Sequence, residues 1–136
     1  MRFMMIMYPK VSAYTAPPTL EQMRPMMKYN EELAKAGVLL GLDGLTPPAQ
    51  GARLHWEGKG KPRVVDGPFT EAKEIVGGYW LIEVKSRAEA IEWASRIPGE
   101  DCFVEVRKVA GPEDFDADAN EVMRHSVVAE AVGRKW

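Results

Sequence analysis

The sequence predicts an α+β fold in which a single sheet carries two helices. Strand-like runs alternate with two segments of helical periodicity, in the order strand, helix, strand, hairpin, strand, helix, strand. The chain has 136 residues, of which 46% are hydrophobic, and this is enough to bury one core without help from disulfides or metals. We therefore expect one domain with ordinary globular composition.

The first half of the chain supplies two strands and one helix. Residues 2–8 are almost all apolar, which indicates a buried strand. Thr19, with a glutamine three residues later, predicts a capping box that begins a helix, and Gly37 predicts its end. Pro25 lies inside this pattern and indicates either a kink or a later start. Residues 38–42 then form a short apolar strand.

The second half repeats this arrangement after an inserted hairpin. Residues 53–56 and 63–65 flank a glycine-rich turn, which is typical of a β-hairpin. Residues 76–84 form the next strand, and Ser86 with a glutamate three residues later begins the second helix. The alternating run 103–107 is the last strand of the sheet.

Without the hairpin, the order is β-α-β-β-α-β, which is the ferredoxin-like order. A sheet of this kind has helices on one face only, and its other face is exposed and apolar unless something covers it. Face-to-face pairing of two identical sheets covers both, so we expect a homodimer. The tail adds an irregular acidic segment (112–119) and a C-terminal helix (121–132).

Composition excludes several classes of function. The net charge of −2 does not favour nucleic acid or an anionic membrane surface, and no apolar run has the length of a membrane span. The single cysteine, Cys102, excludes an internal disulfide and fits a reducing cytoplasm. His55 and His125 are the only histidines, which argues against a Cys/His metal site. We also find no motif for a redox cofactor or a phosphate-binding loop, and expect no cofactor.

One run carries the functional signal. Residues 66–74 read Asp-Gly-Pro-Phe-Thr-Glu-Ala-Lys-Glu, and Gly-Gly-Tyr follows at 77–79. This run resembles the hallmark of the DGPF-domain proteins, a branch of the YCII-related superfamily. The resemblance covers roughly residues 1–110, and leaves 111–136 as an extension that we expect to be helical and packed on the dimer. It implies a dimeric α+β barrel built from ferredoxin-like protomers.

The resemblance says less about function. Members of this family are mostly small bacterial proteins of uncertain role; some are linked to extracytoplasmic-function sigma factors, and a few relatives act on aromatic or chlorinated small molecules. In part of the superfamily a histidine on the first helix and an aspartate form a proposed catalytic dyad. The corresponding stretch here, residues 26–30, contains no histidine. Only the aspartate of the loop, Asp66, is carried over by the resemblance.

Residues of this loop are the first candidates for a site. Asp66 either caps the turn with its side chain or acts as a general base in a cleft. Phe69 either walls a pocket or fills the dimer interface. Glu71, Lys73 and Glu74 are either a solvated run of ion pairs, or Lys73 binds an anionic group while one of the glutamates moves a proton.

Tyr79 and His55 extend this set. A buried tyrosine hydroxyl needs a hydrogen-bond partner, and Asp66 or Glu74 is expected to supply it. His55 lies on the hairpin and points either to solvent or, if the hairpin folds over the cleft, to the position of the missing helix histidine.

Arg107 and Met5 complete the candidates. Arg107 on the last strand is expected to pair with one of the loop glutamates or to bind a substrate carboxylate. Met5 on the first strand belongs either to an adaptable apolar pocket or to the core.

These residues lead to two hypotheses of different kinds. In the first, an apolar cleft binds an unknown acidic organic compound, and the site performs cofactor-free proton transfer as an isomerase or lyase. In the second, the protein is a non-enzymatic regulatory or ligand-binding partner, linked to a sigma factor, and the DGPF loop holds the dimer together. A buried site with an open pocket favours the first.

Overall fold

The computed structural model describes residues 1–10, 17–69 and 74–133. Four strands form the main sheet: β1 (Arg2–Tyr8), β2 (Leu39–Gly44), β5 (Gly78–Glu83) and β6 (Phe103–Lys108). The remaining elements are α1 (Leu20–Lys35), η2 (Pro48–Gln50), β3 (Ala52–His55), β4 (Arg63–Asp66), α2 (Arg87–Ser95), η3 (Pro112–Asp114), α3 (Ala117–Arg124) and α4 (Val127–Ala131). The predicted α+β class is confirmed.

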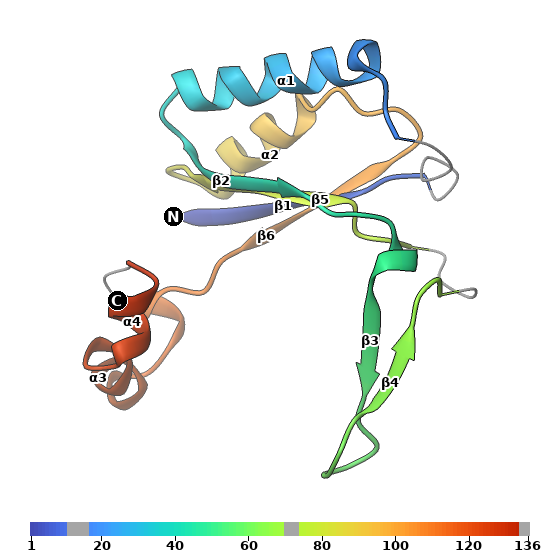
Figure 1. The fold of residues 1–136 in the computed structure, drawn as a ribbon. Helices are drawn as coiled ribbons and strands as arrows, with labels where there is room; N and C mark the ends of the chain where they lie inside the picture. Colours follow the sequence, from blue (N-terminus) through green and yellow to red (C-terminus); the bar gives the residue numbers. More distant parts are fainter. Residues whose placement is uncertain (11–16, 70–73, 134–136) are drawn as a thin grey trace.

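The main sheet has the order β2-β5-β1-β6, and every neighbouring pair of strands is antiparallel. This arrangement is consistent with the ferredoxin-like fold expected from the element order. Both α1 and α2 lie on one face of the sheet (Figure 1). We call the opposite side of the sheet the open face.

The core lies between the two helices and the sheet. Alternate residues of the strands point to the helices, as the period of two requires. The fully or nearly fully buried side chains are Phe3, Met5, Tyr29, Leu33, Trp80, Ile82, Val84, Ala90 and Ile97. Tyr29 donates a hydrogen bond from its hydroxyl to the Trp93 carbonyl oxygen (2.7 Å), which joins α1 to α2. Burial raises the pKa of Tyr29 to about 12.

Helix α1 begins where its capping box was predicted. The Thr19 hydroxyl accepts from the Gln22 amide, and the Gln22 side chain accepts from the Thr19 amide. The helix continues through Pro25, so a downstream start is wrong: the box already holds the first turn. Gly37, with φ of 74°, follows the last turn, as predicted.

Strands β3 and β4 form the predicted hairpin, a separate two-stranded sheet. The hairpin extends from one end of the main sheet on the side of the open face (Figure 1). Leu54 pairs with Val64, and both are exposed.

The tail differs from the single predicted helix. It contains two short helices, α3 and α4, instead of one. The first helix ends before Ser126, and the Ser126 side chain caps α4 by accepting a hydrogen bond from the Val128 amide. The acidic segment before Glu121 is helical from Ala117, and the Asp116 side chain caps this helix.

Lys108 at the end of β6 connects this tail to the sheet. Its ammonium group contacts Glu113 (2.6 Å) and Asp114 (2.7 Å). These hydrogen bonds raise the pKa of Lys108, and they lower the pKa values of Glu113 and Asp114. In the part of the chain that the structure describes, no helix has the length and apolarity needed to cross a membrane.

Candidate functional site

A pocket of about 190 Å³ lies at the edge of the main sheet, where the ends of β2 and β5 meet α1. Its lining is mostly apolar, with four side chains able to form hydrogen bonds. The lining residues are Met7, Met26, Asn30, Leu42, Asp43, Gly44, Gly77, Gly78, Tyr79 and Trp80. Concave apolar sites with a few polar groups are the usual form of small-molecule sites.

The Gly77–Gly78 pair shapes one side of this pocket. The Gly77 amide donates to the Met7 carbonyl oxygen (2.8 Å), and its own carbonyl accepts from the Leu45 amide (2.9 Å). A Cβ atom on Gly78 would lie 2.7 Å from the Asp43 carbonyl oxygen. Gly78 thus lets the backbone of β2 approach β5 closely.

Trp80 and Asn30 form the inner wall. The indole N–H of Trp80 donates to Oδ1 of Asn30 (2.8 Å), and this bond joins the sheet to α1. The Tyr29 ring meets the Trp80 ring edge-on, with 5.9 Å between the centroids. Both aromatic rings are buried, so the wall is held in place before any ligand arrives.

Asp43 and Tyr79 are a polar pair at the rim of the pocket, and their side chains lie on the open-face side of the sheet, because Tyr79 alternates with the buried Trp80 and lies opposite Ile6. They are directly opposite on β2 and β5, and the Tyr79 hydroxyl donates to Oδ2 of Asp43 (2.7 Å). This hydrogen bond and the negative charge of Asp43 raise the pKa of Tyr79, so the phenol keeps its proton at neutral pH. The predicted partners of Tyr79, Asp66 and Glu74, are therefore wrong.

None of the described residues of the DGPF loop (66–69 and Glu74) lines this pocket, and residues 66–69 hold the hairpin. The Gly67 amide donates to the Gly51 carbonyl oxygen (2.9 Å), and the Gly67–Pro68 peptide bond is cis. A side chain at Gly67 would collide with the Pro48 carbonyl of η2. Phe69 is half-buried, and the Arg53 guanidinium lies 4.0 Å from its ring centroid. The loop thus packs β4 against η2 and β3 within one chain.

Asp66 and Glu74, two of the acidic candidates of this loop, are exposed. Within the described residues the Asp66 carboxylate accepts no hydrogen bond, so the expected cap of the turn is not formed there. Glu71 and Lys73 lie outside the described residues. His55 on β3 is exposed as well, and the hairpin does not carry it to the pocket.

Arg107 and Met5 are also placed differently from the expected cleft. Arg107 contacts Glu105 on its own strand (3.6 Å), rather than a glutamate of the loop. Met5 is 0% exposed and belongs to the core under the helices, so the alternative of a pocket-lining Met5 is wrong. Of the candidates in the described part of the chain, Tyr79 alone lines the pocket, and the predicted convergence with Asp66, Glu74 and Arg107 is not found.

Asp43, Asn30 and Trp80 were missed by the sequence analysis. Two of them left a weak signal: Asp43 interrupts an apolar strand between a leucine and a glycine, and Asn30 is a polar residue in the apolar stripe of α1. Among the described residues no group of three or more histidine, cysteine or acidic side chains could hold a metal ion.

Two comparisons relate the chain to known proteins. The model of the YCII-related domain matches residues 1–110. An uncharacterised protein of Rhizobium meliloti (strain 1021), R00369, is 35% identical over 72 residues, which are 53% of this chain and 57% of that protein. The chain thus aligns with little more than half the length of this relative. The domain match covers the whole ferredoxin-like unit, and the chain belongs to the YCII-related family.

Proposed function

We propose that the protein binds a small, mainly apolar molecule in the pocket between β2, β5 and α1. The observation that supports this proposal is the pocket itself, with apolar walls and the Asp43–Tyr79 pair. Its volume, about 190 Å³, lies below the range of roughly 300–1,000 Å³ that is common for drug-sized ligands. The ligand we propose is correspondingly small, such as a single substituted ring.

The electrostatics of the pocket favour a neutral ligand or one that donates hydrogen bonds. Among its described lining residues there is no lysine or arginine, and Asp43 contributes a carboxylate. An anionic group would meet this carboxylate without a compensating cation among the described lining residues. We therefore propose that the ligand is a neutral ring compound with a polar substituent, and not the acidic compound expected from the sequence.

We further propose that Asp43, rather than Asp66, is the general base if the bound molecule reacts. An aspartate carboxylate can remove a proton from a carbon atom of the ligand, and the Tyr79 hydroxyl fixes one of its oxygens. This is cofactor-free proton transfer, the chemistry of an isomerase or lyase. The catalytic roles suggested for Asp66, Glu74 and His55 stay predictions.

A thermal-shift screen of small neutral ring compounds tests the binding proposal. A ligand at a hundredfold its Kd stabilises the folded state by about 2.7 kcal/mol, which a melting curve detects. We expect the shift to decrease in Asp43→Asn and Tyr79→Phe, and to persist in the matched control Asp66→Asn. Equal shifts in the wild type and the three variants would show that the ligand binds at another site.

Hydrogen–deuterium exchange of the bound ligand separates enzyme from binding protein. In heavy water, a base that removes a C–H proton returns a deuteron, and NMR of the ligand follows this exchange. If Asp43 is the base, Asp43→Asn slows the exchange by roughly 100-fold or more. Binding without exchange in the wild-type protein favours the alternative, a non-enzymatic ligand-binding or regulatory protein.

That alternative has one observation in its favour. The contacts of Gly67 and Phe69 join the end of β4 to Gly51 at the end of η2 and to Arg53 on β3, so the described part of the family hallmark has an architectural use. In a regulatory protein, the residues of the hallmark would maintain the fold of the hairpin and would not take part in a reaction. The link to a sigma factor stays a prediction of the resemblance.

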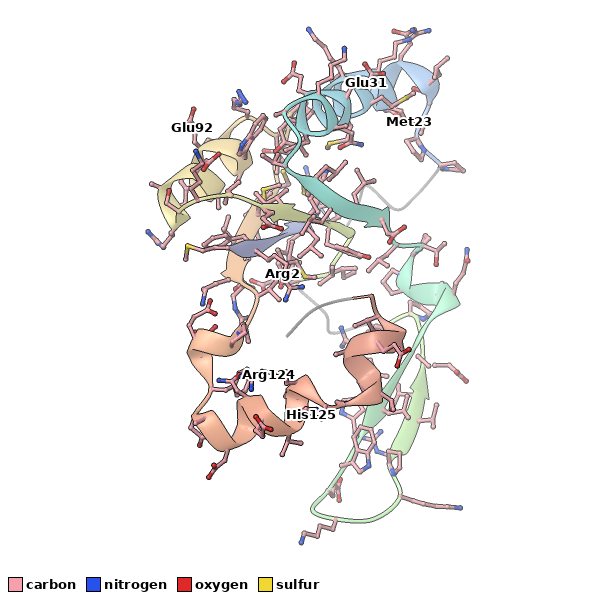
Figure 2. All side chains as sticks on the ribbon, turned by 90° about the vertical axis from the view of Figure 1, so that its left-hand side faces the viewer. Arg2, Met23, Glu31, Glu92, Arg124 and His125 are labelled. Carbon is pink, nitrogen blue, oxygen red and sulfur yellow. The ribbon has the colours of Figure 1, made fainter. Side chains whose placement is uncertain are left out.

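We also propose that the working unit is a homodimer with the two open faces together. Met4, Ile6 and Leu81 line this face and are half-buried, and the rings of Tyr8 and Phe103 stack on it at 4.5 Å. Arg2 lies on the same face, opposite Glu83 (Figure 2). An apolar face with both signs of charge is suited to a copy of itself. Size-exclusion chromatography with light scattering should give twice the chain mass.

A further inference from the structure

The β3–β4 hairpin has an apolar side that nothing in the described chain covers. Leu54 and Val64 are paired on this side, and Val64 is 61% exposed. Trp56 follows two residues after Leu54 and is 59% exposed. A two-stranded hairpin is at best marginally stable in water unless a further strand or helix packs on it. The hairpin therefore needs a partner.

The described part of the tail, residues 111–133, also needs a partner to pack against. Its two helices have eight and five residues, and helices this short are not stable on their own. Val122 is 71% exposed and Val127 79%, and Val128 is exposed beside them. In the described part of a single copy, these three valines are therefore exposed apolar side chains.

Hairpin and tail carry opposite charge. Residues 52–66 of the hairpin contain four lysine and arginine residues and two acidic ones. Residues 111–136, the whole extension, contain six acidic residues and three basic ones, and two of the acidic residues, Glu113 and Asp114, contact Lys108. Two apolar surfaces of opposite charge are complementary, whereas either surface against its own copy would place like charges together.

Within one copy the two elements do not meet. Both extend to the side of the open face, but the hairpin lies at one end of the sheet and the tail at the other (Figure 1). Seen from the side of the tail, both lie below the sheet, and the hairpin extends further from it than the tail does (Figure 2). Each is thus positioned for a molecule that approaches the open face.

A two-fold axis parallel to the sheet turns a second sheet to face the first. If the axis is perpendicular to the line from hairpin to tail, the rotation also exchanges the two ends, and each hairpin meets the other copy's tail. If the axis runs along that line, hairpin meets hairpin and tail meets tail. The charges favour the first axis.

We propose that the apolar side of the β3–β4 hairpin is the docking site for the α3–α4 tail of a second copy. This inference rests on the proposed homodimer. It adds the direction of the two-fold axis and the contacts at the two ends of the facing sheets. The hairpin and tail then clamp the two facing sheets at both ends. The tail, which lies outside the matched family domain, becomes part of the interface.

Disulfide trapping tests this contact directly. Val64→Cys is placed in one chain and Val128→Cys in another, both with Cys102→Ser to remove the native thiol, and the two chains carry different affinity tags. After joint refolding, dimers that retain both tags are isolated and oxidised. We expect a disulfide-linked dimer on a non-reducing gel from the mixed pair, and much less from either variant alone.

The outcomes distinguish this proposal from the dimer itself. Mixed dimers that retain both tags but form no mixed disulfide would overturn the hairpin–tail contact and leave the dimer intact. Cross-links only within the separate single variants would indicate the other axis. A monomer by light scattering would overturn both proposals.

A second measurement does not depend on cysteines. Val127→Asp combined with Val128→Asp places charge in the apolar contact, and we expect it to weaken the dimer by roughly tenfold or more. Leu20→Asp, at an apolar position on α1 that is about as exposed as Val128, is the control and should leave the dimer unchanged. Circular dichroism confirms that each variant is folded. An unchanged dissociation constant in the double variant would refute the proposal.

Discussion

The hydrogen bond between Trp80 and Asn30 provides a quantitative test of how the pocket wall is held. The indole N–H donates to Oδ1 of Asn30 at 2.8 Å, and Trp80 is only 6% exposed. In Asn30→Leu the side chain keeps its approximate volume but loses the acceptor. The indole N–H is then buried without a partner, because the leucine cannot accept a hydrogen bond.

The magnitude follows from the cost of an orphaned donor. A buried polar group that loses its partner destabilises a protein by about 1–3 kcal/mol, more than the net contribution of roughly 0.5–1.5 kcal/mol from an ordinary hydrogen bond. With a urea m-value of about 2 kcal/mol/M, this lowers the midpoint of unfolding by roughly 0.5–1.5 M. Leucine gains some helix propensity and apolar burial, which offset part of the loss.

A double-mutant cycle removes those side effects. Urea unfolding is followed by circular dichroism for the wild type, Asn30→Leu, Trp80→Phe and the double variant. In the Trp80→Phe background no indole N–H remains to be orphaned, so Asn30→Leu should cost about 0.5 kcal/mol or less. The same loss in both backgrounds would show that the bond does not hold the wall, and the reasoning about the pocket would fail.

Three further predictions concern burial, close contact and charge. Burial raises the pKa of Tyr29 to about 12. The stability that the protonated Tyr29 contributes is therefore complete below pH 10 and is lost as the pH rises towards 12. Tyr29→Phe should remove this alkaline dependence from the free energy of unfolding, measured in unfolding curves. Gly78→Ala brings a Cβ atom to 2.7 Å from the Asp43 carbonyl oxygen and should destabilise by about 1–3 kcal/mol, whereas Gly41→Ala, with open space around its Cβ, should cost less, both measured by urea unfolding. Lys108→Gln should return the lowered pKa values of its two carboxylate partners towards ordinary values in an NMR titration; values that stay low would assign the shift to the backbone.

Much of the fold could be predicted because its signals are local. The capping residues Thr19 and Ser86 lie within three residues of their partners, and the turn of the hairpin follows from its glycines. The order of elements then limits the sheet to few topologies. The tail was predicted less well, because the break at Ser126 is a competition between continuing one helix and capping the next.

The residues of the site were harder to predict from the sequence than the fold. Several charged residues in one loop form a recognisable motif, whereas two residues that pair across neighbouring strands are far apart in the sequence and form none. The DGPF loop has conspicuous residues, yet its described part contacts η2 and β3. The pocket instead uses Asp43 and Tyr79, which are 36 residues apart in the sequence. Neither residue alone indicates a site.

Their meeting depends on one irregularity in β2. The register of β2 with β5 shifts between Leu39 and Gly41, so that Leu40 is an extra residue. In an unshifted ladder Leu42 would be opposite Tyr79, and Asp43 would be opposite Gly78 on the face that carries the helices. A slip of one residue reverses the face of every following side chain. The bulge therefore turns Leu42 towards the core and Asp43 towards Tyr79, and the polar pair exists because of a single residue whose effect only three-dimensional pairing reveals.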